Sequence, residues 1–137
     1  MDAPHLLIVD DDPLFLRTFG RVLTRDFIVS CETSAESALE IIDAARGLEL
    51  YDVILCDLVM PGMGGRQLYG ALVARRSRLA TRLLILTGAV TPADDAFAAH
   101  MGPRYLAKTG SIDDLKRMVR NTAQPRLTLP FAPLAVA

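Results

Sequence analysis

The chain contains several short apolar runs, and each of them ends at a polar residue. The runs are 6–9 before Asp10 and Asp11, 53–56 before Asp57, 83–86 before Thr87, and 106–107 before Lys108. Continuous apolar runs of this length are typical of strands that are buried on both faces of a parallel sheet. Between them, apolar residues recur at the three- and four-residue spacing of amphipathic helices. The pattern therefore predicts strands that alternate with helices.

Capping residues and periodicity place these elements along the chain. We expect strands at 6–9, 27–31, 52–57, 82–87 and 104–108. We expect helices at 13–25, at 35 to about 47, at a segment carrying Leu68, Leu72 and Leu79, after Thr91 and Pro92, and from 112 onward. Asp12 and Ser111 can cap the first and last helices, and Thr33 with Glu36 has the form of a capping box.

Five strands alternating with five helices predict an α/β fold with a doubly wound, five-stranded parallel sheet. In the flavodoxin-like order 2-1-3-4-5, the first and third strands are neighbours at the switch point, where such sheets bind ligands. Asp10, Asp11 and Asp57 would then meet at one sheet edge. We expect this domain to occupy residues 1–123, and the proline-containing apolar stretch 124–137 to be a linker or a docking tail.

Composition narrows the function classes. The 137 residues suit one domain, and 15 basic against 16 acidic side chains give a formal net charge of −1. This balance provides no general attraction to nucleic acid or to an anionic membrane, and no apolar run approaches membrane-spanning length. Cys31 and Cys56 both fall in expected strands, so we expect buried thiols. These features predict a cytoplasmic protein whose chain binds neither nucleic acid nor membranes.

Three carboxylates at one sheet edge repel each other strongly. At about 5 Å and an effective dielectric constant of about 20, each pair costs roughly 3 kcal/mol. Either the carboxylates are protonated or a cation lies among them. Mg²⁺ fits best, because it takes one or two carboxylates and completes its octahedron with water and phosphate oxygens. Asp57 is then the candidate nucleophile toward phosphorus, while Lys108 and Thr87 could neutralise and hydrogen-bond the transferring oxygens.

Four segments resemble the receiver domain of two-component response regulators. They are 6–12, 57–65, 87–89 and 105–108, and they occur in the family's order and spacing over about residues 5–122. The resemblance implies that Asp57 is the phosphoacceptor. It also implies a Mg²⁺ site made by Asp10, Asp11, Asp57 and the backbone carbonyl of Val59.

The same resemblance assigns signalling roles. Thr87 would be the signalling hydroxyl, Lys108 the phosphate-binding lysine, and Tyr105 the switch aromatic. The domain would be a phosphorylation-dependent switch, without enzyme activity beyond its own phosphorylation and slow dephosphorylation. A histidine kinase or phosphotransfer protein would supply the phosphoryl group. The face formed by the fourth helix, fifth strand and fifth helix would select partners, a second copy in a homodimer among them.

Three positions depart from the family pattern. Thr109 follows Lys108 where the family usually has a proline with a cis bond, and a cis bond without proline costs about 3 kcal/mol. We therefore expect a trans bond and a differently shaped loop, which brings the reach of Lys108 into question. Gly64 stands where an acidic residue is common. Val59 has no polar side chain to orient an attacking water, which predicts a long-lived phosphoryl state.

Two other function classes compete with the switch. A degenerate receiver that never accepts phosphate would act as a constitutive docking module, and the Lys108–Thr109 junction favours it. A haloacid-dehalogenase-type phosphohydrolase also forms an aspartyl phosphate on a similar sheet. That class needs a second aspartate two residues after its nucleophile, where this chain has Val59, so the sequence argues against it.

Overall fold

The computed structural model describes residues 3–88 and 95–124. Its strands are β1 (His5–Val9), β2 (Ile28–Glu32), β3 (Val53–Cys56), β4 (Leu83–Thr87) and β5 (Tyr105–Ala107). Its helices are α1 (Pro13–Leu23), α2 (Ala35–Ala44), α3 (Gly65–Ala74), α4 (Asp95–Met101) and α5 (Ile112–Ala123), with short 3₁₀ helices η1 (Arg78–Arg82) and η3 (Gly102–Arg104). The five strands are parallel and lie in the order β2-β1-β3-β4-β5. The expected fold class and sheet order are confirmed.

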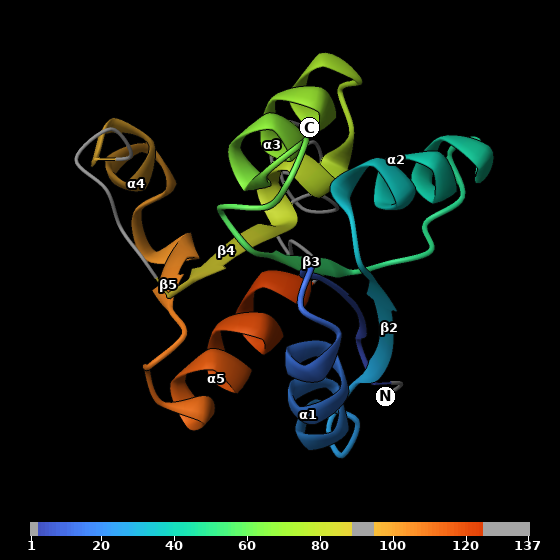
Figure 1. Cartoon of the computed structure of the whole chain (residues 1–137). Coiled ribbons are helices and arrows are strands. Elements are labelled where there is room, and N and C mark those ends of the chain that lie inside the picture. The colour runs from blue at the N-terminus through green and yellow to red at the C-terminus, as the bar shows by residue number, and fades with distance from the viewer. Residues whose placement is uncertain (1–2, 89–94, 125–137) are drawn as a thin grey trace, which may run out of the picture.

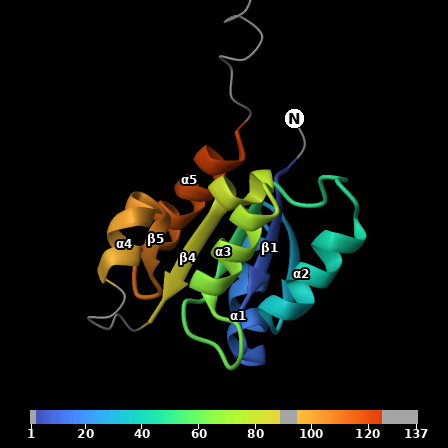
Figure 2. The same ribbon diagram turned by 90° about the horizontal axis from the view of Figure 1, so that it is seen from above.

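The sheet forms the middle of three layers. Figure 1 shows α2 and α3 on one face and α1 and α5 on the other, and Figure 2 shows the same arrangement from above. Alternate residues of β1 enter the two resulting cores: Leu7 and Val9 pack with α2 and α3, and Leu6 and Ile8 pack with α1 and α5. Because both faces are covered, the central strands read as continuous apolar runs rather than as alternating ones.

The helix caps agree with two predictions and correct a third. Asp12 caps α1, since its Oδ1 accepts a hydrogen bond from the N–H of Leu14 at 3.0 Å. Ser111 caps α5 in the same way. The expected capping box at Thr33 was wrong: the N-cap of α2 is Ser34, whose Oγ accepts from the N–H of Ser37 at 3.0 Å.

The glutamate of that expected box serves a tertiary contact instead. Glu36 Oε2 accepts a hydrogen bond from the N–H of Met63 at 3.1 Å, which ties α2 to the loop between β3 and α3. A carboxylate used there is unavailable to the amino end of its own helix. The capping prediction failed because the competing partner lies 27 residues away in the sequence.

Two further expectations need correction. Leu79 does not continue α3, because that helix ends at Ala74 and Leu79 lies in η1. Cys31 is exposed rather than buried, because β2 is an edge strand and much of it faces solvent, while Cys56 in β3 is buried. The expected helix start at Thr91 and Pro92 and the tail beyond 124 lie outside the described residues. Within the described residues, no helix is both long enough and apolar enough to cross a membrane.

Candidate functional site

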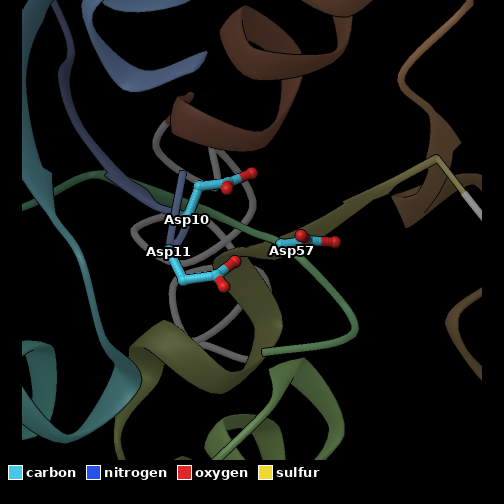
Figure 3. Close-up of side chains that lie close together, drawn as sticks. All are labelled: Asp10, Asp11 and Asp57. Atoms are coloured by element: carbon cyan, nitrogen blue, oxygen red, sulfur yellow. The ribbon is translucent and has the colours of Figure 1, made fainter. Parts of the chain in front are cut away.

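The ends of β1 and β3 bring three carboxylates together. The strands are parallel neighbours with Val9 paired to Cys56, so the residues that follow them lie at the same level. The N–H of Asp57 donates to the carbonyl of Val9 at 3.0 Å and fixes this register at the strand ends. One carboxylate oxygen from each of Asp10, Asp11 and Asp57 lies within 4.8 Å of the others. Figure 3 shows the three side chains gathered at this edge.

The three carboxylates differ in their surroundings. Asp10 is buried, and its Oδ1 accepts a hydrogen bond from the N–H of Asp12 at 2.9 Å. Asp11 is exposed, and the burial of Asp57 is intermediate between that of Asp10 and that of Asp11. The cluster is therefore anchored on its inner side by Asp10 and open to solvent on the side of Asp11.

Lys108 is the cation of this site in the described structure. Its Nζ lies 2.8 Å from Asp10 Oδ2 and 3.3 Å from Asp57 Oδ2. The described residues contain no cis peptide bond, so the Lys108–Thr109 bond is trans, as expected. The trans bond leaves the ammonium within reach of Asp57. The departure from the family pattern at Thr109 therefore does not move the ammonium away from Asp57 in the described structure.

Phe15 also positions the lysine, a contact that the predicted helix 13–25 did not indicate. The Lys108 ammonium lies 4.3 Å from the centre of the Phe15 ring, and that ring stacks on Phe19 at 4.8 Å. An aromatic face attracts a cation through its quadrupole. One signal was available in the sequence: Phe15 lies in the first turn of a helix that starts directly after the acidic residues.

Burial and neighbouring charges shift the pKa values of Asp57 and Lys108. Burial raises the pKa of Asp57, and the negative charge of Asp10 adds to this, although Lys108 and a hydrogen bond from the Val59 backbone oppose it. Burial disfavours the Lys108 ammonium, but the hydrogen bond to Asp10 and the charge of Asp57 raise its pKa overall. One ammonium faces three carboxylates. A further cation would therefore be stabilised here.

The donor set fits Mg²⁺. The clustered ligand atoms are all carboxylate oxygens, and hard divalent cations prefer oxygen over nitrogen or sulfur. The exposed side at Asp11 leaves room for the water and phosphate oxygens that Mg²⁺ retains in its octahedron. The carbonyl of Val59, in the loop directly after Asp57, stays a prediction as a further ligand.

Thr87 and Tyr105 lie along the sheet from the acidic cluster. Thr87 ends β4 and is buried, and its carbonyl accepts from the N–H of Lys108 at 2.9 Å. Tyr105 begins β5, and its half-buried ring packs edge-on against Phe97 of α4 at 6.3 Å. Thr87 is thus coupled through the backbone to Lys108, and Tyr105 lies between the sheet and α4. Their predicted signalling roles stay predictions.

The turn after Asp57 depends on glycine. A Cβ atom built on Gly65 would lie 2.7 Å from the carbonyl oxygen of Asp57 and 2.7 Å from Cδ1 of Ile85. Gly62 adopts a φ of 73°, which favours glycine. Gly64, which departs from the family pattern, is the N-cap of α3 and lies against the carbonyl of Leu58. The backbone packs closely behind the acceptor, a constraint that the sequence indicated only as a turn.

Comparison with protein-family models identifies the domain. The model of the response regulator receiver domain matches residues 6–120. The chain belongs to this family. Receiver domains are parts of two-component response regulators, and the resemblance seen in the sequence is confirmed. The match begins in β1 and ends in α5, so it includes every strand of the sheet.

Curated relatives are longer proteins. The receiver domain is 31% identical over 121 residues to the transcriptional regulatory protein TcrA of Mycobacterium tuberculosis, covering 85% of this chain and 44% of TcrA. It is 33% identical over 132 residues to the acid tolerance regulatory protein ActR of Rhizobium meliloti, covering 95% of this chain and 65% of ActR. The chain thus spans less than two thirds of the length of these relatives.

Solved structures agree with the fold. A signal receiver domain assigned to NarL of M. tuberculosis superposes with a TM-score of 0.73 and 29% identity, covering 92% of this chain and all of that one. FixJ-N superposes with a TM-score of 0.77 and 22% identity, covering 94% of this chain and all of that one. At that lower identity the likeness shows the fold alone.

Proposed function

We propose that this receiver domain is a phosphorylation-driven signalling switch in which Asp57 accepts the phosphoryl group. The observation that carries the proposal is the convergence of Asp10, Asp11 and Asp57 within 4.8 Å, with the Lys108 ammonium 3.3 Å from Asp57. Such an arrangement combines a nucleophilic carboxylate with one ammonium that can neutralise phosphoryl oxygens, and its remaining carboxylates could hold a divalent cation that adds positive charge. The donor would be a phosphohistidine of a histidine kinase or phosphotransfer protein.

In the transfer step, a carboxylate oxygen of Asp57 forms a bond to phosphorus as the bond from phosphorus to the donor imidazole breaks. A bound Mg²⁺, held by Asp10, Asp11, Asp57 and the Val59 carbonyl, would supply positive charge to the phosphoryl oxygens. Lys108 neutralises an oxygen from the other side, because its ammonium already contacts Asp57. Positioning and electrostatic stabilisation are sufficient for phosphoryl transfer, which needs little other machinery.

The signal would travel from Asp57 to the face formed by α4, β5 and α5. Phosphorylation adds charge and acceptor oxygens beside the end of β4. Thr87 would hydrogen-bond a phosphoryl oxygen, and the space that it leaves would admit the ring of Tyr105. This change would alter the surface seen by partners, including a second copy of the domain. The chain would catalyse only its own phosphorylation and slow dephosphorylation.

Intact mass spectrometry after incubation with acetyl phosphate and Mg²⁺ tests the proposal. We expect the mass to increase by one phosphoryl group, and chelation of Mg²⁺ to abolish the increase. The variant Asp57→Asn should gain no phosphoryl group. The matched variant Asp113→Asn, which changes an exposed aspartate of α5, should be labelled like the wild type. A wild-type chain that stays unlabelled, or an Asp57→Asn chain that is labelled equally, would contradict the proposal.

A further inference from the structure

A pocket lies at the end of the sheet opposite Asp57. It has a volume of about 500 Å³ and is lined by the segment from Ile42 to Glu49, by Tyr51, and by the segment from Arg75 to Leu79. Tyr51 precedes β3 and Leu79 precedes β4, whereas Asp57 and Thr87 follow those strands. Because the strands are parallel, the pocket and the acidic cluster lie at opposite sheet edges.

Two arginines hold the walls of this pocket together. Arg75 at the end of α3 donates from Nε and Nη2 to both carboxylate oxygens of Asp43 on α2, at 2.8 and 3.1 Å. Arg78 pairs with Glu49 at 2.6 Å and donates to the carbonyl of Tyr51 at 3.1 Å. These contacts join the α2–β3 loop to the segment after α3. These contacts hold the pocket walls in place, and a pre-organised site has a lower entropic cost of binding.

Two more arginines line the same pocket without such partners. Within the part of the chain that the structure describes, neither Arg46 nor Arg76 has a carboxylate within ion-pair distance. Both have a φ of 51° and lie one residue beyond the C-cap of α2 or α3, where glycine is the usual residue. Arginine at these two positions supplies two positive charges, although a positive φ is less favourable for arginine than for glycine.

The charge and the apolar lining together indicate the ligand class. Four arginines against two carboxylates leave the lining with a net charge of +2. Leu48 is 74% exposed, and Ile42 and Leu79 add further apolar surface to the lining. We propose that this pocket binds a small organic phosphate. Its phosphate, a near-dianion at neutral pH, would be held by Arg46 and Arg76. Its apolar body would lie against Leu48 and the wall beneath it.

Phenyl phosphate is a suitable probe, because it combines a phosphate monoester with a small apolar ring. Its binding to the full chain can be followed by two-dimensional NMR of the backbone amides, with EDTA present so that no divalent cation binds at Asp57. We expect saturable shifts at residues 46–49 and 75–79, with none at Asp10, Asp11 or Asp57. Absence of saturable binding, or shifts confined to the acidic cluster, would overturn the proposal. The Mg²⁺-free design keeps this outcome independent of phosphorylation.

Arginine variants distinguish binding in this pocket from attraction to general surface charge. The double variant Arg46→Gly/Arg76→Gly removes two charges, and glycine suits both positive φ angles, so the fold should persist. We expect it to bind phenyl phosphate at least tenfold more weakly. The control Arg21→Gln/Arg25→Gln removes the same charge from exposed positions in and after α1, and should bind like the wild type. Equal weakening in both double variants, or none in the first, would contradict the proposal.

Simpler probes test the ligand class. Inorganic phosphate lacks the apolar body and should bind more weakly than phenyl phosphate at the same residues. Benzyl alcohol lacks the charge and should cause no saturable shift there. Benzoate supplies a single negative charge, so we expect weaker binding than that of phenyl phosphate. Benzoate binding as tightly as phenyl phosphate would contradict the assignment to phosphates, and benzyl alcohol binding equally would contradict a role for the arginines.

Discussion

Asp57 is held in a negative environment that folding creates. Burial and the nearby charge of Asp10 raise the pKa of its carboxyl above the ordinary value. The folded chain then binds more protons at this group than the unfolded chain does. Ionised Asp57 therefore lowers the stability of the metal-free domain at neutral pH, and this loss diminishes as pH falls through the folded pKa toward the unfolded one.

The variant Asp57→Asn tests whether ionised Asp57 lowers the stability of the domain. Without Mg²⁺ at neutral pH, we expect the variant to be more stable than the wild type by about 1 kcal/mol, because one buried charge is removed. The difference should shrink as the pH is lowered. Mg²⁺ should raise the melting temperature of the wild type and have a smaller effect on the variant, because the variant loses a ligand. Thermal denaturation with EDTA and with Mg²⁺ measures both effects, and a less stable variant in EDTA would refute the argument.

Phe15 should affect the rate of phosphorylation through Lys108. Replacing its ring by leucine keeps apolar volume but removes the quadrupole beneath the ammonium, which is worth about 0.5–1 kcal/mol at partly exposed sites. We expect Phe15→Leu to slow labelling by acetyl phosphate about two- to fivefold, and Phe15→Tyr to keep the rate. The matched variant Phe19→Leu removes the stacked neighbour, which lies outside the cation–π contact between Lys108 and Phe15 in the described part of the chain, and should slow labelling less. Equal rates for Phe15→Leu and wild type would exclude this role.

Val59 sets the expected lifetime of the phosphorylated state. Its side chain is exposed next to the acceptor and has no group that can hold an attacking water. We expect Val59→Asn to hydrolyse the acyl phosphate about tenfold faster, a change of about 1.4 kcal/mol in the barrier, because a carboxamide can orient water. Loss of label from the purified, phosphorylated protein measures this rate. The prediction fails if the wild type already loses its label as fast as the variant.

At the scale of elements, the amino end of α3 is packed against the acceptor strand. Gly65→Ala would place a methyl group 2.7 Å from the Asp57 carbonyl oxygen and 2.7 Å from Cδ1 of the buried Ile85. Overpacking of this kind costs about 1–3 kcal/mol. We expect denaturant unfolding to show a loss in that range, and phosphorylation of Asp57 to slow.

The same helix offers a matched control. Gly70 is exposed, and an added Cβ atom there would meet nothing within 4 Å. Gly70→Ala should therefore stabilise the domain by about 0.5–1 kcal/mol, because alanine is the better helix residue. The two substitutions make the same chemical change in one helix. If both changed stability in the same direction, close packing at Gly65 would not be the cause.

Local sequence signals predicted most elements and failed where a distant contact decided the outcome. Strand runs and helix periodicity were sufficient for the sheet order, and the strand ends were sufficient for the meeting of Asp10, Asp11 and Asp57. Thr33 and Ser34 both suit an N-cap; Ser34 caps α2, and Glu36 contacts a loop formed later in the chain. Phe15 was missed for the same reason, because its partner is 93 residues away.

At the scale of the whole molecule, ion pairs connect α5 to the turn after α1. Asp26 accepts from Lys116 at 2.8 Å and from Arg120 at 2.9 Å. The hydrogen bond from Lys116 lowers the pKa of Asp26. A carboxyl with a lowered pKa contributes stability above its unfolded pKa, and this contribution is lost as pH falls through the folded value.

Asp26→Asn should therefore have a pH-dependent effect on stability. We expect the variant to unfold at lower denaturant concentration than the wild type at neutral pH, because the link between α5 and α1 loses its charge. The difference should vanish at acidic pH, where the wild-type carboxyl is protonated as well. The comparison variant Asp114→Asn removes an exposed pair within α5 alone and should have a smaller effect at neutral pH. A constant difference across the pH range would point to lost packing instead.

The order of the strands also bears on how the domain folds during synthesis. The interior strand β1 leaves the ribosome before the other strands, yet its neighbour β3 follows more than 40 residues later. One core also needs Leu115 and Val119 of the last helix to cover Leu84 and Leu86. A nascent chain stopped before α5 would present that apolar face to water and to chaperones. The domain can therefore complete its fold only after nearly all of its residues have emerged from the ribosome.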